Sequence, residues 1–172
     1  MCSPQTIAAL LLLNLDNPAS TFVALANALN RPLPLAFFAS DHGAQVGVYE
    51  LILRTLAHKS PSLHEHMTRT VGEVPADRYL YGMLASMFTS VLAVDEAARL
   101  WDVYVFEGDT VLVRAAVACL LNNEMALLGT RTEDEIRAIL SGRAPREDGK
   151  EGISASETED HFMRSVREAG KE

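Results

Sequence analysis

The stretch Arg99-Leu-Trp-Asp-Val-Tyr-Val-Phe-Glu-Gly-Asp109 decides the fold class of this chain. Together with Ala97 just before it, its apolar side chains Leu100, Trp101 and Tyr104 recur at spacings of three and four residues, the period of one helix face. A run that favours β-structure, Val103 to Phe106, lies within this pattern without interrupting it. The acid-glycine-acid sequence at its end predicts a turn that stops the helix, with Asp109 capping the next one. Asp102 is predicted to accept hydrogen bonds from a neighbouring helix start.

The same helical signals extend outward along most of the chain. Between residues 46 and 56, one apolar stripe contains Val46, Tyr49, Ile52, Leu53 and Leu56. A long helix over 110–128 is predicted to stop at Gly129, and capping side chains predict helix starts at Asn17-Pro18, Asp41-His42, Ser60-Pro61, Thr132 and Ser156. No Asn-Gly or Asp-Gly pair joins two alternating segments, so strands are not expected. The sequence therefore predicts an all-α domain of about eight to ten short helices.

Composition divides the chain into three parts. Residues 1–142 carry the helical patterns and are predicted to form one domain that is incomplete at its N-terminal side. Residues 143–156 are rich in Gly, Glu and Arg and predict a flexible linker. Residues 157–172 predict an amphipathic helix that either docks on the domain or frays, with Phe162, Met163 and Val166 on one side.

The apolar run at residues 7–13 imitates a signal peptide, but no Lys or Arg precedes it. It is also shorter than the roughly 20 apolar residues that cross a bilayer. We interpret it as a helix that is buried on all sides. Because a core helix usually follows other elements, we expect the chain to be a fragment. The absent helices would then leave a large exposed apolar patch here, of a size that promotes association.

The composition argues against several classes of function. The chain has 172 residues and a formal charge of −8, which argues against binding nucleic acid or anionic lipid through bulk electrostatics. Its two cysteines, Cys2 and Cys119, make no disulfide framework and indicate a reducing, intracellular compartment. His64 and His66 point in different directions on a helix, so they do not share a metal. The sequence shows neither a glycine-rich phosphate loop nor a self-contained active site.

The stretch from Arg99 to Ala116 resembles the TBC-domain GTPase-activating proteins for Rab GTPases. The motif of that family joins an Arg, an aliphatic residue, Trp-Asp, a hydrophobic stretch, Glu-Gly and a long helix. In this chain the motif residues are Arg99, Trp101, Asp102, Glu107 and Gly108. The segments 29–32, 36–38 and 41–43 are similar to one branch of the family. The resemblance runs from about Gln5 to Leu140 and covers the C-terminal portion of such a domain.

The resemblance implies an all-helical domain that inserts two fingers into a bound Rab. One is an Arg in an aliphatic-x-x-Asp-x-x-Arg motif, whose cation neutralises charge on the transferred phosphoryl group. The other is the Gln of Tyr-x-Gln-Gly, which orients the attacking water. This chain has no such Arg motif, and Gln5 lies in Ser3-Pro4-Gln5-Thr6. Gln5 is therefore either the finger glutamine after a deletion or a coincidental match. No other arginine can be assigned the finger role from the sequence, and this includes Arg31, Arg54 and Arg99.

The expected function is therefore activation of GTP hydrolysis on Rab-type small GTPases, in the regulation of vesicle trafficking, with catalysis impaired or lost. Two alternatives remain: a non-catalytic helical interaction module that retains the TBC scaffold, and a generic helical domain with a coincidental Trp-Asp motif. No cofactor is expected, because nucleotide and Mg²⁺ would belong to the Rab partner. The sequence carries no lipid-attachment motif, so we expect a cytoplasmic protein that reaches endomembranes through its partner.

Overall fold

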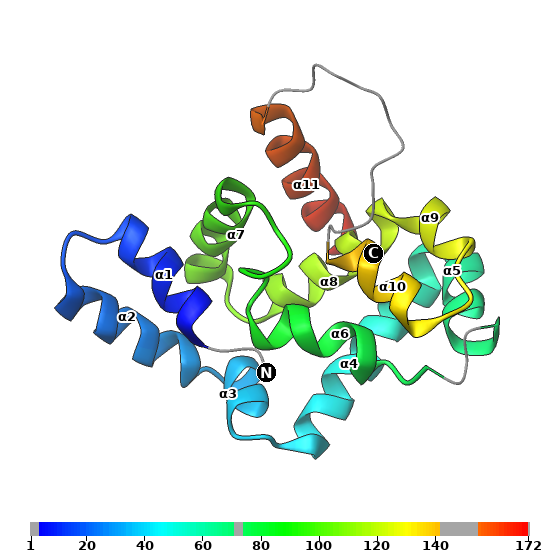
Figure 1. Cartoon of the computed structure of the whole chain (residues 1–172), viewed down its shortest axis with the longest axis horizontal. Coiled ribbons are helices and arrows are strands. Elements are labelled where there is room, and N and C mark those ends of the chain that lie inside the picture. Colours follow the sequence, from blue (N-terminus) through cyan, green and yellow to red (C-terminus); the bar gives the residue numbers. More distant parts are fainter. Residues whose placement is uncertain (1–3, 71–73, 142–154, 172) are drawn as a thin grey trace.

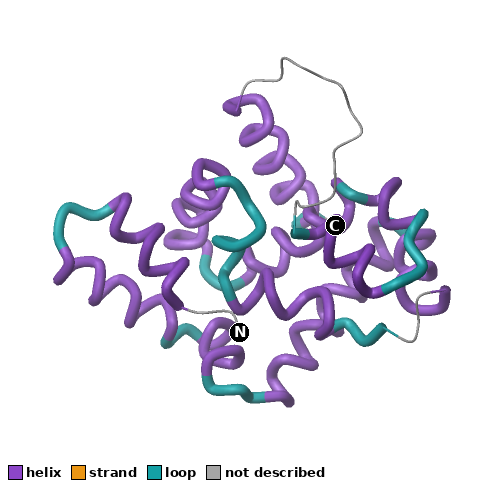
Figure 2. The backbone as a smooth tube through the Cα atoms, viewed as in Figure 1, coloured by secondary structure: helices purple, strands orange, loops and turns teal. Residues whose placement is uncertain are grey.

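The computed structural model describes residues 4–70, 74–141 and 155–171. Over these residues the chain is all-helical and contains no strand, as the sequence predicts (Figures 1 and 2). A π-helical turn, η1, follows α5 at His66–Thr70. The described part contains eleven α-helices: α1 (Pro4–Asn14), α2 (Pro18–Leu29), α3 (Pro32–Phe38), α4 (His42–Lys59), α5 (Pro61–Glu65), α6 (Asp77–Ala85), α7 (Val94–Glu107), α8 (Thr110–Asn122), α9 (Glu124–Leu128), α10 (Glu133–Leu140) and α11 (Ala155–Ala169).

Ten of these helices, α1 to α10, lie before residue 142, within the range of about eight to ten expected for the domain, but the apolar run over 110–128 forms two helices where one long helix is predicted. Helix α8 ends at Asn122, and α9 begins two residues later. Between them, the Asn123 side-chain amide donates to the carbonyl oxygen of Cys119 at 2.8 Å. This bond satisfies a carbonyl of the last turn of α8, where helical partners are lacking. The periodicity does not reveal the break, because apolar residues continue beyond it.

Local capping sets several helix starts where the sequence predicts them. Side-chain oxygens accept hydrogen bonds from amides in the first turns of α2, α4, α5 and α10, and these caps are Asn17, Asp41, Ser60 and Thr132. At α10 the capping box is reciprocal, because the Glu135 carboxylate accepts from the amide of Thr132 at 3.2 Å. The amide of Arg131 also donates to this carboxylate, and this bond, followed by the one from Thr132, lowers the pKa of Glu135.

The core is organised around α8, whose buried residues are Val111, Leu112 and 115–120. This helix packs against α4, α6, α7, α9 and α11 (Figure 1). On α4 the buried face contains Gln45, Tyr49, Ile52 and Leu56, whereas Val46 of the predicted stripe is half exposed. Helix α8, and not the first helix of the chain, is therefore the buried central helix.

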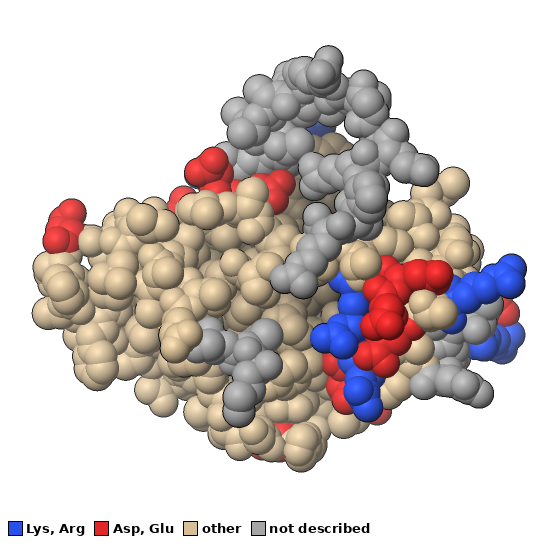
Figure 3. Space-filling model, viewed as in Figure 1, with Lys and Arg blue, Asp and Glu red and all other residues tan. Residues whose placement is uncertain are grey.

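Helices α1 and α2 form a hairpin at one end of the molecule (Figure 1). Helix α1 packs on α2 and α7, with Ile7 and Leu10 buried. The prediction that residues 7–13 are buried on all sides is wrong, because only one face of α1 meets neighbours. On the face shown in Figure 3, most charged side chains lie away from this hairpin. We call four exposed side chains of this hairpin the apolar end; they are Leu12, Leu13, Phe22 and Val23.

Helix α11 packs across α7 and α8 with Phe162, Met163 and Val166 buried. The Lys59 ammonium donates to the carbonyl oxygen of Glu168 at 3.0 Å. A cation at the C-terminus of a helix is favoured by the helix dipole, so this contact helps to hold α11 in place. Residues 143–154 of the predicted linker lie outside the described residues. The division into a domain, a linker and a final helix stays a prediction.

Candidate functional site

Trp101 anchors the connection between α6 and α7. It is the single Trp of the chain and is only 6% exposed. Its indole N–H donates to the carbonyl oxygen of Met87 at 3.2 Å, and its ring meets that of Tyr104 edge to face at 5.6 Å between centroids. Met87 and Phe88 are buried with positive φ values of 48° and 68°. Trp101 therefore holds a backbone conformation that non-glycine residues rarely adopt.

Gln5, the candidate finger glutamine, is exposed in the first turn of α1. The next residue, Thr6, accepts a hydrogen bond at 2.8 Å from the hydroxyl of Thr89, which lies 83 residues further along the chain. Thr89 belongs to the connection that Trp101 holds, two residues after Met87. The structure thus brings the start of α1 to the α6–α7 connection that Trp101 holds. The finger role of Gln5 stays a prediction.

The turn Glu107-Gly108-Asp109 separates α7 from α8. Gly108 has φ 79° and ψ −158°, a region that glycine almost alone occupies. Asp109 does not cap α8 through its side chain as predicted, because its own backbone is already helical. Instead, its Oδ2 accepts from the amide of Leu33 at 2.8 Å. Leu33 lies in the first turn of α3, whose N-cap Arg31 makes no side-chain capping bond. Asp109 therefore caps α3 from 76 residues away.

Arg31, at the start of α3, in turn contacts the end of α7. Its guanidinium lies 4.7 Å from the centroid of the Tyr104 ring and donates to the Tyr104 carbonyl oxygen at 3.1 Å. This carbonyl belongs to the last turns of α7, where the helix dipole favours a cation. Burial raises the pKa of the Tyr104 phenol, and the nearby charge of Asp109 raises it further. We call the group Arg31, Tyr104, Gly108 and Asp109 the α3–α7 clamp.

No local sequence signal predicts this clamp. Arg31 precedes a proline and has the pattern of an ordinary surface cation, while Asp109 has the pattern of a cap for the helix that follows it. The residues that these side chains contact lie 73 and 76 positions away in the sequence. Because the Arg31 guanidinium is engaged with the end of α7, this arginine already has a structural role.

The remaining motif residues lie on the solvent side of α7. Asp102 is exposed and faces the guanidinium of Arg99 at 3.9 Å. The prediction that Asp102 accepts hydrogen bonds from a neighbouring helix start is therefore wrong. A helix turns by about 100° per residue, so the residue after the inward-facing Trp101 points away from the core. Glu107 forms an ion pair with Arg114 of α8.

Metal-ligating side chains do not gather in one place among the described residues. Within them, no three His, Cys, Asp or Glu side chains lie close enough together to hold a metal ion. Cys119 is a buried free thiol, and burial raises its pKa to about 12. Across the same ranges, none of the helices combines the length and apolarity needed to span a bilayer.

These features define a helical domain built on a Trp-Asp helix and a Glu-Gly-Asp turn. The Rab-GTPase-TBC domain family matches residues 5–128 of the chain. This range includes Gln5, the α3–α7 clamp and the Trp101 motif, by which we mean Arg99, Trp101, Asp102, Glu107 and Gly108. The chain therefore belongs to the Rab-GTPase-TBC domain family, and the resemblance drawn from its motifs is confirmed.

Curated relatives carry the same domain name. The chain is 35% identical to TBC1 domain family member 14 of Rattus norvegicus over 114 residues, which are 66% of this chain and 16% of that protein. It is 34% identical to TBC1 domain family member 12 of Xenopus tropicalis over 122 residues, 71% of this chain and 17% of the relative. A TBC domain-containing protein of Schizosaccharomyces pombe is 33% identical over 135 residues, 78% of this chain and 27% of its own length. The matches thus span 16–27% of these three relatives.

Proposed function

We propose that this chain docks on a Rab-type small GTPase and belongs to the GTPase-activating class. The observation that carries the proposal is the family match over residues 5–128, which contains the complete clamp and the Trp101 motif. The clamp supports it physically, because it locks the start of α3 to the end of α7 and so holds the surrounding surfaces in fixed positions. Preformed surfaces of this kind suit docking with little backbone change. Nucleotide and Mg²⁺ then belong to the partner, and the chain is cytoplasmic and reaches endomembranes through that partner.

We further propose that the chain by itself leaves GTP hydrolysis on the partner slow. Its 172 residues contain no aliphatic-x-x-Asp-x-x-Arg motif. Arg31 is engaged in the clamp, and Arg99 lies beside Asp102 on the surface of α7. Without a cation at the phosphoryl oxygens, the charge of the transition state is not neutralised. Such a finger contributes about 10³- to 10⁵-fold in rate.

The expected result is binding without acceleration. In single-turnover assays across a panel of GTP-loaded Rabs, an excess of the chain should leave the hydrolysis rate at its intrinsic value. Biolayer interferometry on the same panel should detect a complex with at least one member. Gln5→Ala should change neither result, because orienting the attacking water raises the hydrolysis rate little when no arginine cation is present.

Two outcomes would contradict this pair of proposals separately. Acceleration of about tenfold or more that Gln5→Ala abolishes would show that catalysis is intact and that Gln5 is a finger. Failure to bind any Rab, with the variant and the parent chain both folded, would refute docking itself.

The apolar end favours a second candidate function, that of a non-catalytic interaction module. Leu13 and Phe22 are 73% and 71% exposed on the α1–α2 hairpin. Several large apolar side chains exposed on one hairpin suit an association surface. This second function uses the same scaffold and requires no finger residues.

The apolar end is expected to cause self-association of the isolated chain. Sedimentation velocity should show a concentration-dependent dimer or larger species. The double variant Leu13→Glu, Phe22→Glu should raise the dissociation constant at least about tenfold, because burying one such side chain contributes about 1.5–3 kcal/mol. Met125→Glu is the matched control, since Met125 is 85% exposed on the separate helix α9. Equal effects of the double variant and the control would assign association to general charge repulsion instead.

A further inference from the structure

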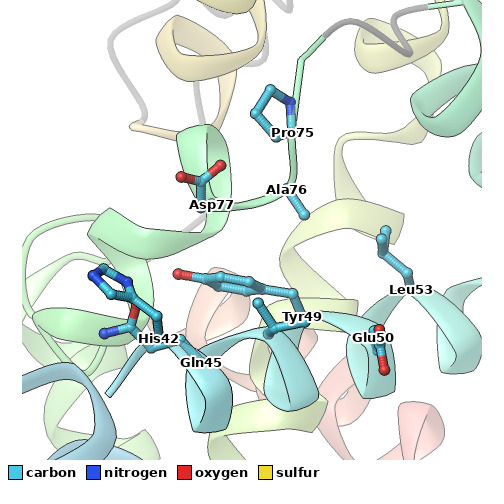
Figure 4. Close-up of a pocket in the computed structure, with 9 residues that line it drawn as sticks. His42, Gln45, Tyr49, Glu50, Leu53, Pro75, Ala76 and Asp77 are labelled. Atoms are coloured by element: carbon cyan, nitrogen blue, oxygen red, sulfur yellow. The ribbon is translucent and has the colours of Figure 1, made fainter. Parts of the chain in front are cut away.

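A pocket of about 300 Å³ lies between the first half of α4 and the start of α6 (Figure 4). It is separate from the clamp and from the Trp101 motif, none of whose residues line it. One part of its lining is apolar and consists of Val46, Leu53, Pro75 and Ala76. The other part is polar and consists of His42, Gln45, Tyr49, Glu50 and Asp77.

The phenol of Tyr49 is the least expected feature of this pocket. Tyr49 is only 6% exposed, and its hydroxyl has no hydrogen-bond partner among the described residues. Figure 4 shows this hydroxyl lying between the side chains of His42 and Asp77. Burial, followed by the charge of Asp77, raises the pKa of Tyr49, so the group is a neutral hydroxyl at physiological pH. Buried hydroxyls normally have a hydrogen-bond partner, so this one indicates that a bound group supplies the partner.

The charged residues around the pocket favour a cation as the hydrogen-bond partner of the Tyr49 hydroxyl. Glu50 and Asp77 line the pocket, and no Lys or Arg among the described residues does. The Gln45 amide is already occupied, because it donates to the carbonyl oxygen of Ala36 at 2.9 Å. A neutral phenol oxygen accepts an N–H, and a carboxylate beside it strengthens binding of the same positively charged donor.

The size and the walls of the pocket favour a single long side chain as the bound group. Sites for small molecules occupy about 300–1,000 Å³, so this pocket lies at the lower limit of that range. Its apolar wall suits a methylene stem that ends in a charged head. The rim is apolar at Val46, which lines the pocket and is half exposed. An apolar rim beside a polar centre is what a protein partner covers, whereas a free amine leaves it in water.

We propose that this pocket receives a lysine or arginine side chain of a partner protein, with its cation between Asp77 and the Tyr49 hydroxyl and its stem along Val46 and Pro75. No residue of the clamp lines this pocket, and the proposal does not rest on docking of a Rab.

The test uses blocked amino acids as probes of the full chain. In ¹H–¹⁵N NMR titrations, Nα-acetyl-arginine methylamide or its lysine counterpart should produce saturable shifts at the amides of residues 42–53, Ala76 and Asp77. The citrulline analogue has nearly the same shape without the charge and should produce none. Placing the arginine between two leucines in a blocked tripeptide should tighten binding about tenfold, because the apolar rim is then covered.

Two variants and one control make the test specific. Asp77→Asn removes only the charge and should weaken binding about tenfold. Tyr49→Phe removes only an unpartnered hydroxyl, so it should fold normally and weaken binding about threefold or more. Asp16→Asn makes the same charge change between α1 and α2 and should have no effect.

Several results would overturn the proposal. Equal shifts of the same amides by citrulline would show that the pocket does not recognise the cation. Shifts by arginine over the whole acidic surface, or equal binding to Asp77→Asn and to the parent chain, would show that the pocket is not the binding site. A tripeptide no tighter than the single amino acid would mean that the pocket takes a free amine and not a partner protein.

Discussion

Replacing Trp101 with Ala should lower the free energy of unfolding by about 3–5 kcal/mol, the largest loss expected from one substitution in this chain. The change removes a large buried ring from α7 and leaves a cavity beside Tyr104. It also removes the indole donor from the Met87 carbonyl, in a connection that already contains two buried residues with positive φ. Domains of this size are stable by about 5–15 kcal/mol, so the variant should lose a large part of its stability.

Urea unfolding followed by far-UV circular dichroism measures this loss, because the variant contains no Trp for fluorescence. Trp101→Phe is the matched control, since it keeps an aromatic ring in the core and removes the indole N–H. Its cost should be smaller, about 1–2 kcal/mol. A loss of less than about 1 kcal/mol for the alanine variant would mean that Trp101 does not anchor the α6–α7 connection.

Replacing Gly108 with Ala should lower the free energy of unfolding by about 1–3 kcal/mol. The cost is torsional, because φ 79° with ψ −158° strains any residue that has a Cβ atom. Space does not limit the substitution, since an added Cβ would lie 3.6 Å from Nη1 of Arg31, an ordinary contact distance. The strain falls on the turn that orients Asp109, so the cap of α3 should weaken together with the turn.

Gly47→Ala provides a control of opposite sign. Gly47 lies in the interior of α4, and nothing stands within 4 Å of the Cβ that alanine would add there. Alanine should therefore raise the free energy of unfolding by about 0.5–1 kcal/mol through its better helix propensity. Thermal unfolding of both variants beside the parent chain measures the two effects, and a shift of the same sign in both would show that the Gly108 conformation is not a constraint.

Much of the architecture is readable from the order of the residues. The helical period around Trp101, the caps at Asn17, Asp41 and Ser60, and the capping box at Thr132 are all properties of a few neighbouring residues. The family motif is also local, so one continuous stretch of sequence is enough to carry the TBC resemblance. Interactions within one helical turn do not depend on the rest of the chain, so a linear pattern is enough to predict them.

Other features depend on which helices meet. The sequence does not show that Asp109 caps α3, that Arg31 closes on α7, or that the Tyr49 hydroxyl faces Asp77 across a pocket. Nor does it show which face of α1 is covered, and the prediction of all-round burial failed for that reason. The period of apolar residues in the sequence indicates that one face of a helix is apolar, but it does not indicate which element packs on that face. Contacts between residues more than 70 positions apart arise only when several helices pack together. The pairs Arg31–Tyr104 and Leu33–Asp109 therefore depend on the tertiary structure.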